Sequence, residues 1–228
     1  MSRRILVTGC GRSGTGYFAA LLSRLDIACG HEVLFHPEFQ AAGPVAWAED
    51  TPAESSWLAA PFLERLPNGT VVVHLVRQPE LVLRSLWRTG LFRTRSIYRS
   101  FAEKHCRALQ HGTPHEQTVK YWLRWNELVE RSRDVRGLRY VRVRLDAVDE
   151  STVRWIGELA ERDIDPALAR RALAEVPLDT NTAGDRGQDC EVDWSALTGS
   201  PLRAQTEELA ARYGFGPHAL RSLLSRAA

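Results

Sequence analysis

The sequence predicts an α/β protein in three layers, with a central parallel sheet and helices on both faces. Two observations predict it. Apolar, β-branched runs alternate with segments of helical periodicity, and the strongest run, residues 71–76, is apolar on both faces, as a central parallel strand is. With 228 residues, of which 44% are hydrophobic, the chain has the size and composition of one globular unit, so we expect residues 1–228 to form a single domain.

The expected elements follow one another as strands and helices. Residues 4–8 form a short apolar run that ends in a glycine-rich turn, and apolar residues recur at helical spacing over residues 15–25. Further strands are expected at residues 27–29, 71–76 and 138–143. Helices are expected from the early 80s to about residue 109 and at residues 121–129, 153–161, 166–175, 201–213 and 217–225, with a loop at 178–192.

The basic residues are almost all arginine. The net charge is only +2 and the sequence pI is about 8.4, which does not indicate a nucleic-acid binder. Lys104 and Lys120 are the only lysines, so a phosphate-binding loop in this chain must work without one. The stretch from Arg77 to Arg107 has a net charge of +6, and the rest of the chain sums to −4. We expect its arginines, from Arg84 to Arg107, to form a solvated helix face; an acceptor lid or a site for an anionic acceptor is the alternative.

Cysteine spacing and apolar runs indicate in which cellular compartment the protein is expected. Cys10, Cys29, Cys106 and Cys190 form no CxxC pair, so neither a zinc site nor a disulfide framework is indicated. The apolar stretch near the amino terminus is too short for a signal peptide, and no window approaches the roughly 18 apolar residues of a membrane span. We therefore expect a soluble protein of the reducing cytoplasm.

Residues 8–16, Thr-Gly-Cys-Gly-Arg-Ser-Gly-Thr-Gly, are the most informative segment. Glycines let the backbone turn sharply, and successive N–H groups at a helix amino terminus then bind phosphate or sulfate. The spacing is not the Walker pattern, because Arg12 precedes Ser13-Gly-Thr15 and no lysine follows. Residues 9–14 do match the string GxGxxG, and Glu32 lies at about the distance of the acidic residue in a dinucleotide site, so spacing alone leaves that alternative open.

The Arg-Ser-Gly-Thr run at residues 12–15 resembles the 5′-phosphosulfate loop of sulfotransferases that use 3′-phosphoadenosine 5′-phosphosulfate (PAPS). Residues 73–85 are similar to the 3′-phosphate site of that family, in which a strand delivers an arginine (Arg77) and the next helix a serine (Ser85). The resemblance implies a P-loop NTPase-like fold, PAPS as co-substrate and no metal. The cofactor-binding residues that it implies are Gly11, Arg12, Ser13, Gly14, Thr15, Gly16, Tyr17, Arg77, Ser85, Arg186 and Gly187.

Some of these assignments have alternatives. Arg186 and Gly187 occupy the place of the family's late cofactor loop, although the usual lysine is missing. Tyr17 matches a position whose ring stacks on adenine, but an aromatic residue in the first turn of a helix is more often part of the core. Tyr121, Trp122 and Trp125 are expected to pack in the core rather than to line an acceptor pocket.

The segment Cys29-Gly-His-Glu-Val-Leu-Phe-His36 resembles segments of heparan sulfate and tyrosylprotein sulfotransferases that contain the presumed catalytic base. The resemblance implies Glu32 as base and Arg12 as the catalytic cation at the departing phosphate oxygens. His31 and His36 are rival bases. Cytosolic members use a histidine before the 3′-phosphate strand, but this chain has Glu54-Ser-Ser-Trp there, which favours Glu32. The alternative for Glu32 is a solvated or ion-paired loop carboxylate.

The resemblance therefore implies transfer of a sulfuryl group to a hydroxyl or, as the weaker alternative, an amine. The acceptor is a small molecule, saccharide, lipid or peptide rather than a nucleic acid, and no motif specifies it further or indicates the oligomeric state. A P-loop nucleotide kinase or related phosphotransferase is the first alternative, disfavoured by the missing GK[ST]. A non-catalytic nucleotide-binding protein is the second.

Overall fold

The computed structural model describes residues 3–40, 43–177 and 197–216. The chain divides into two compact units. The first consists of residues 1–76 and 128–181, and the second of residues 77–127 and 182–228. Among the described helices, none is both long and apolar enough to cross a bilayer.

The first unit contains a parallel sheet of five strands among the described residues. Their order across the sheet is β2 (Cys29–His31), β3 (Ala53–Ser55), β1 (Ile5–Gly9), β4 (Val71–Val76) and β5 (Arg139–Arg144). Every neighbouring pair is parallel. The carboxyl ends of β1, β2 and β3 therefore lie at one edge of the sheet, and the loops that follow them open at that edge.

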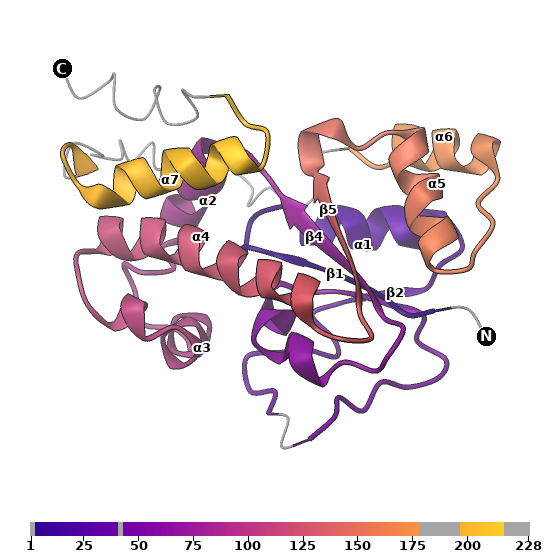
Figure 1. The fold of residues 1–228 in the computed structure, drawn as a ribbon, viewed down its shortest axis with the longest axis horizontal. Coiled ribbons are helices and arrows are strands. Elements are labelled where there is room, and N and C mark those ends of the chain that lie inside the picture. Colours follow the sequence, from indigo (N-terminus) through magenta and orange to yellow (C-terminus); the bar gives the residue numbers. More distant parts are fainter. Residues whose placement is uncertain (1–2, 41–42, 178–196, 217–228) are drawn as a thin grey trace. The chain divides into compact units, whose positions relative to one another are not determined.

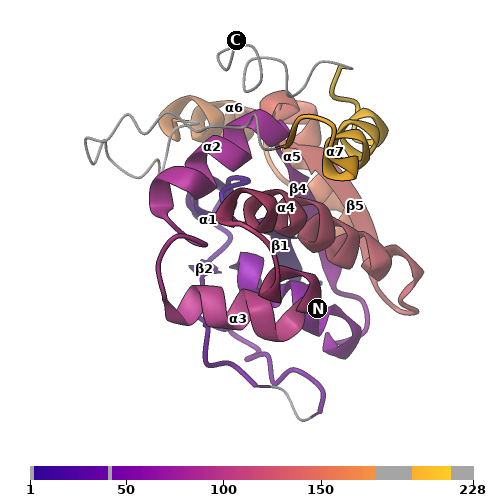
Figure 2. The same cartoon turned by 90° about the vertical axis from the view of Figure 1, so that its left-hand side faces the viewer.

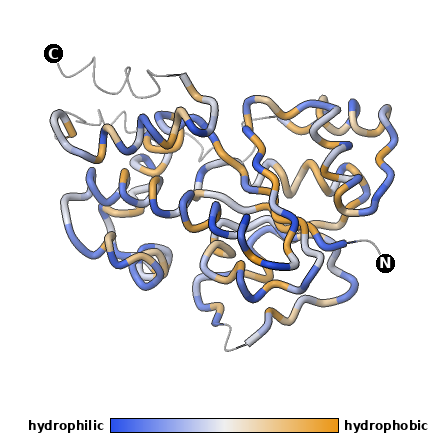
Figure 3. The backbone as a smooth tube through the Cα atoms, viewed as in Figure 1, coloured by the Kyte–Doolittle hydropathy of each residue, from blue (hydrophilic) through white to orange (hydrophobic). Residues whose placement is uncertain are grey.

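One face of this sheet packs against three helices of the same unit. These are α1 (Thr15–Arg24), α5 (Glu150–Leu159) and α6 (Pro166–Glu175) (Figure 1). Because side chains alternate along a strand, Ile5 and Val7 of β1 share a face with Val73 of β4, and all three belong to one core with the helices. Figure 3 shows the apolar residues concentrated along the central strands.

Short 3-10 helices complete the first unit. They are η1 (Trp57–Arg65), η3 (Arg131–Asp134) and η4 (Leu145–Ala147). η1 follows β3 almost directly: Ser56 is its N-cap, and the Ser56 hydroxyl accepts a hydrogen bond from the backbone N–H of Leu58 at 3.1 Å.

The second unit is helical in its described part. Its elements are α2 (Pro79–Thr89), α3 (Ile97–His105), η2 (Arg107–Gln110), α4 (Pro114–Glu130, which ends within the first unit's residues) and α7 (Pro201–Arg212). The α3 helix packs on α4 through Phe101 and Trp125, whose ring centroids are 6.1 Å apart (Figure 2). Tyr121, Trp122 and Trp125 are all fully buried, which confirms that they belong to the core.

The predicted α/β class with a parallel sheet is confirmed, and β4 and α6 have the predicted bounds. The predicted single helix up to residue 109 is wrong. The α2 helix ends at Gly90, which adopts φ 70°, and α3 starts only after Ser96 caps its first turn. The second strand lies two residues later than predicted, and β3 was not predicted. The predicted loop at 178–192 and the helix at 217–225 lie outside the described residues.

Candidate functional site

The glycine-rich loop connects β1 to α1. Arg12 and Gly14 both adopt left-handed backbone conformations, with φ 72° and φ 105°. Gly14 is the N-cap of α1 and has no side chain to cap the helix. The first N–H groups of α1 therefore have neither an intrahelical acceptor nor a side-chain cap, which is the arrangement that binds an anion at a helix amino terminus.

Two buried hydroxyls lie in or beside this loop. The Oγ of Ser13 and the Oγ1 of Thr8 have no hydrogen-bond partner within the described part of the chain, and the two residues are only 1% and 0% exposed. An unpaired buried hydroxyl costs free energy. Ser13 belongs to the loop itself, and an oxyanion seated there would supply an acceptor for its hydroxyl.

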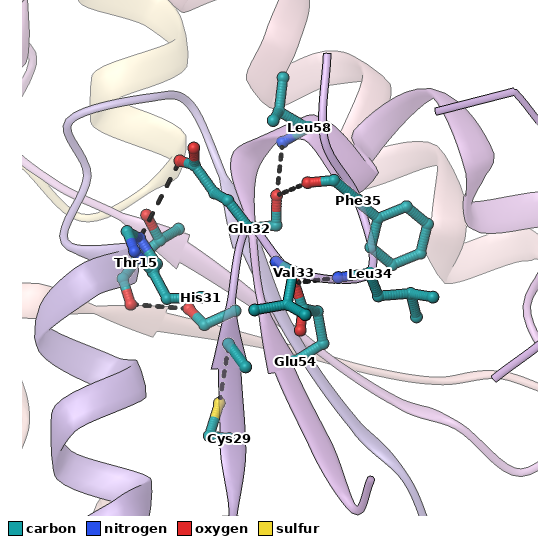
Figure 4. Close-up of polar contacts among 12 residues, drawn as sticks. Thr15, Cys29, His31, Glu32, Val33, Leu34, Phe35, Glu54 and Leu58 are labelled. Carbon is teal, nitrogen blue, oxygen red and sulfur yellow. Dashed lines mark hydrogen bonds and ion pairs between the residues drawn. The ribbon is translucent and has the colours of Figure 1, made fainter. Parts of the chain in front are cut away.

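Glu32 is the first residue after β2, and it too has a left-handed backbone, with φ 57°. Its N–H donates to the carbonyl oxygen of Ser55 at 3.3 Å, which ties the turn to β3. The Glu32 carboxylate is 24% exposed and lies 4.0 Å from Nε2 of His31 (Figure 4). The Trp57 side chain donates a hydrogen bond to it.

Glu32 and Arg12 interact electrostatically, although they come from different loops. Burial raises the pKa of Glu32, while His31, the Trp57 hydrogen bond and Arg12 each act to lower it. Burial lowers the pKa of Arg12, and the Glu32 carboxylate opposes that shift. An arginine keeps its charge at neutral pH even so. The loop after β1 and the turn after β2 thus bring a half-buried cation and a half-buried carboxylate together.

Three consecutive polar residues hold both loops, and the sequence did not indicate this role: Glu54 and Ser55 end strand β3, and Ser56 caps η1 directly after it. Oε1 of Glu54 accepts hydrogen bonds from the N–H groups of Val33 and Leu34, at 2.9 and 3.2 Å. The Ser55 hydroxyl donates to the carbonyl oxygen of Thr15 at 2.7 Å, and that of Ser56 to Phe35 at 3.2 Å. A serine before an apolar run is an N-cap signal and could have indicated an element start at Ser56, but no pattern singles out Glu54.

The rival bases differ in position. His31 lies next to Glu32, within 4.0 Å of its carboxylate. His36 is exposed, and its ring packs edge-on against Phe39 at 6.2 Å. Of the two histidines, His31 is therefore the one placed to act with Glu32.

Tyr17 is buried in the core of the first unit. It is 2% exposed, and its ring packs edge-on against Phe18, with centroids 5.8 Å apart. These are the surroundings of a core residue, the alternative that the sequence offered; its stacking on adenine stays a prediction.

The residues assigned to the 3′-phosphate belong to the second unit. Arg77 is the first residue after β4, and Ser85 lies in α2, two turns from the start of that helix. Both are partly buried. Arg186 and Gly187 lie outside the described residues.

The basic stretch is largely a solvated surface, as the sequence predicts. Arg88, Arg93, Arg95 and Arg107 are exposed, and Arg99 pairs with Glu103 on its own helix at 2.8 Å. Such pairs on a helix surface contribute little to stability.

Comparison with protein-family models gives no match for this chain, and comparison with curated protein sequences gives none either. Within the described residues, no group of three or more His, Cys, Asp or Glu side chains is arranged to hold a metal ion. The functional interpretation therefore depends on the site itself.

Proposed function

We propose that this protein is a PAPS-dependent sulfotransferase, built on a three-layer, P-loop NTPase-like fold and working in the reducing cytoplasm. The observation that carries the proposal is the electrostatic pairing of Glu32 with Arg12 beside the glycine-rich loop. A base and a cation beside an anion-binding loop are the groups that sulfuryl transfer needs.

The loop residues fit a phosphosulfate group. The uncapped start of α1 offers backbone N–H donors, and the buried Ser13 hydroxyl has no partner among the described residues. Hydroxyls and N–H groups are the donors that phosphate and sulfate oxygens accept from. We assign Gly11 to Gly16 to the 5′ end of the cofactor, and Arg77 and Ser85 to its 3′-phosphate.

Bound PAPS would supply an activated sulfuryl group on a phosphate leaving group. The Glu32 carboxylate takes the proton of the acceptor hydroxyl as the new oxygen–sulfur bond forms. The sulfur–oxygen bond to the 5′-phosphate breaks with its electron pair on the phosphate oxygen, and the Arg12 guanidinium offsets the charge that develops there. The products are the sulfated acceptor and 3′-phosphoadenosine 5′-phosphate. Trp57, which donates a hydrogen bond to the base, and His31, 4.0 Å from it, orient the carboxylate.

The raised pKa of Glu32 suits this role. A carboxylate whose pKa lies above its usual range binds a proton more strongly, as a general base must. A solvated loop carboxylate would be open to water, whereas the Glu32 side chain is 24% exposed and accepts a hydrogen bond from Trp57. An ion-paired carboxylate without a catalytic role is the alternative that the substitution below distinguishes.

The decisive substitution is Glu32→Gln, which keeps the size of the side chain and removes the base. We expect loss of turnover by on the order of 100-fold or more, with the affinity for 3′-phosphoadenosine 5′-phosphate unchanged. Turnover is followed as transfer of label from PAPS to a panel of hydroxyl acceptors, and affinity by calorimetry. His36→Gln, an exposed neighbour in sequence, is the matched control. Full activity of the Glu32 variant would refute the mechanism.

The two alternatives predict different results. A nucleotide kinase would transfer phosphate from ATP with magnesium and would not use PAPS. A non-catalytic nucleotide-binding protein would bind the cofactor in the wild type and in the Glu32 variant, and neither would show turnover with any acceptor.

A further inference from the structure

We infer that Glu54 and Ser55 of β3 and Ser56, the N-cap of η1 directly after it, are positioning residues, which fix the Glu32 turn and the start of α1 to this strand end. Each of the three side chains bonds the backbone of a loop that carries site residues. None of them needs to touch the substrate. This inference rests on the proposed function, because it gives these residues a part in the same site.

The Glu54 carboxyl is placed to serve the backbone rather than a ligand. The residue is fully buried, and its Oε1 accepts two consecutive N–H groups directly after Glu32 (Figure 4). Its Oε2 lies against Gly30, where an added Cβ would overlap it. Through these two hydrogen bonds the buried Glu54 side chain ties the turn after β2 to strand β3.

The turn needs such support because it is strained. Glu32 has φ 57°, a left-handed conformation that residues other than glycine seldom adopt because it is sterically unfavourable. Such a conformation persists only where the surroundings determine it. Here the surroundings are the bond from the Glu32 N–H to Ser55 and the two bonds from the following N–H groups to Glu54.

Ser55 and Ser56 extend this support to the start of α1 and to the far end of the Glu32 turn. The Ser55 hydroxyl bonds the carbonyl of Thr15, the first residue of α1, so it holds the phosphate-binding end of that helix. The Ser56 hydroxyl bonds the carbonyl of Phe35, at the far end of the Glu32 turn. The base and the start of α1 are thus held to consecutive residues at the end of β3 and the start of η1.

Charge supports a positioning rather than a proton-accepting role for Glu54. Burial raises its pKa, the amides of residues 33–35 lower it, and the Glu32 carboxylate raises it further. Two carboxyls near one another do not both ionise readily. Glu54 is also without solvent access, so the more exposed Glu32 is the one that an acceptor reaches.

The test compares Glu54→Gln with Glu54→Met. Glutamine keeps an oxygen that accepts the two backbone bonds, whereas methionine keeps the size of the side chain without an acceptor. We expect the methionine variant to lose kcat by on the order of 100-fold with little change in binding of 3′-phosphoadenosine 5′-phosphate, and the glutamine variant to keep most of the turnover. Thr70→Val is the control, because it removes a buried side-chain bond (to Pro67, 2.7 Å) at the start of β4.

A second readout is independent of activity: hydrogen exchange of the Val33 and Leu34 amides in the ligand-free chain. We expect protection in the wild type and in the glutamine variant, and its loss in the methionine variant. Ser55→Ala should instead weaken binding of 3′-phosphoadenosine 5′-phosphate and leave kcat at saturating cofactor nearly unchanged, because it frees the start of α1.

The outcomes separate the two proposals. Unchanged turnover in Glu54→Met, or equal amide protection in all three chains, would overturn the positioning role. If the wild type transfers no sulfuryl group, the proposed function fails, and amide protection alone then decides whether Glu54 holds the turn. A loss of kcat that glutamine does not rescue would show that the charge matters rather than the backbone bonds, and would likewise overturn the positioning role.

Discussion

At the scale of single residues, the carboxyl of Glu32 is subject to opposing influences. Burial favours its neutral form, and the nearby positive groups and the Trp57 hydrogen bond favour its charged form. Burial prevails, so the pKa lies above its usual range. Composition or spacing could not have shown this balance, because it depends on how deeply the turn after β2 is buried and on which side chain of another loop reaches it.

Arg12→Ala should raise the pKa of Glu32 further, because the substitution removes a positive charge that stabilises the carboxylate. The shift is measured by NMR titration of the Glu32 side-chain carboxyl in the ligand-free protein. The acid limb of kcat/KM should move to higher pH by the same amount, since activity requires the ionised base.

Arg12→Lys is the matched control, since it keeps the positive charge, and its Glu32 pKa should stay closer to that of the wild type. A Glu32 pKa that falls or stays constant in Arg12→Ala would contradict the assigned pairing of these two residues.

At the scale of secondary-structure elements, the β1–loop–α1 unit depends on the backbone of Gly14. Its φ of 105° is outside the range of most L residues, and a Cβ there would lie 2.8 Å from Cδ2 of Leu145. Any side chain at this position would both strain the backbone and press on the η4 helix that holds Leu145.

Gly14→Ala should therefore reduce the free energy of unfolding by about 2–4 kcal/mol, from backbone strain and overpacking together. Gly69→Ala is the matched control: φ is 84°, but nothing lies within 4 Å of the added Cβ, so strain alone should cost about 1–2 kcal/mol. Urea unfolding measures the stability loss of each variant. Calorimetry should show weaker phosphate binding only for the Gly14 variant. Equal losses of stability would contradict the packing at Leu145.

The elements that the sequence predicts well are those with local signals. The β4 strand is five apolar residues and His74 after a turn at Asn68-Gly69, and α6 opens with an Asp165 cap and Pro166 at its first position. The β3 strand has no such signal, because it is three residues long and two of them are polar. Its burial results from parallel pairing with β1 and β2, which only the tertiary structure supplies.

The same distinction applies to the candidate site. The glycine-rich loop and Glu32 could be identified because they follow strands within the first 32 residues, in a recognisable motif. The contribution of Glu54 could not, because its partners, Val33 and Leu34, are more than 19 residues away and bind through backbone N–H groups that any sequence would offer.

At the scale of the whole molecule, the chain has almost no lysine, and its positive charge is concentrated between Arg77 and Arg107. Most of these arginines are exposed or paired along their own helix, so the charge of the stretch does not by itself identify a ligand. The assignment of Arg77 to the 3′-phosphate predicts something more specific: discrimination between nucleotides that differ only in that phosphate.

We expect 3′-phosphoadenosine 5′-phosphate to raise the melting temperature of the wild type more than ADP, ATP with magnesium or NAD at equal concentration. A ligand that binds only the native state stabilises it by RT ln(1 + [L]/Kd), so the tighter ligand raises the melting temperature more. Arg77→Ala should weaken the binding of 3′-phosphoadenosine 5′-phosphate by on the order of 10- to 100-fold, as expected for the loss of hydrogen bonds to a charged group. The affinity for ADP should stay nearly unchanged. Arg88→Ala, which removes an exposed arginine from the last turn of α2, should affect neither nucleotide. Equal losses for both nucleotides in Arg77→Ala would remove the 3′-phosphate assignment, and stabilisation by ATP with magnesium alone would favour the kinase.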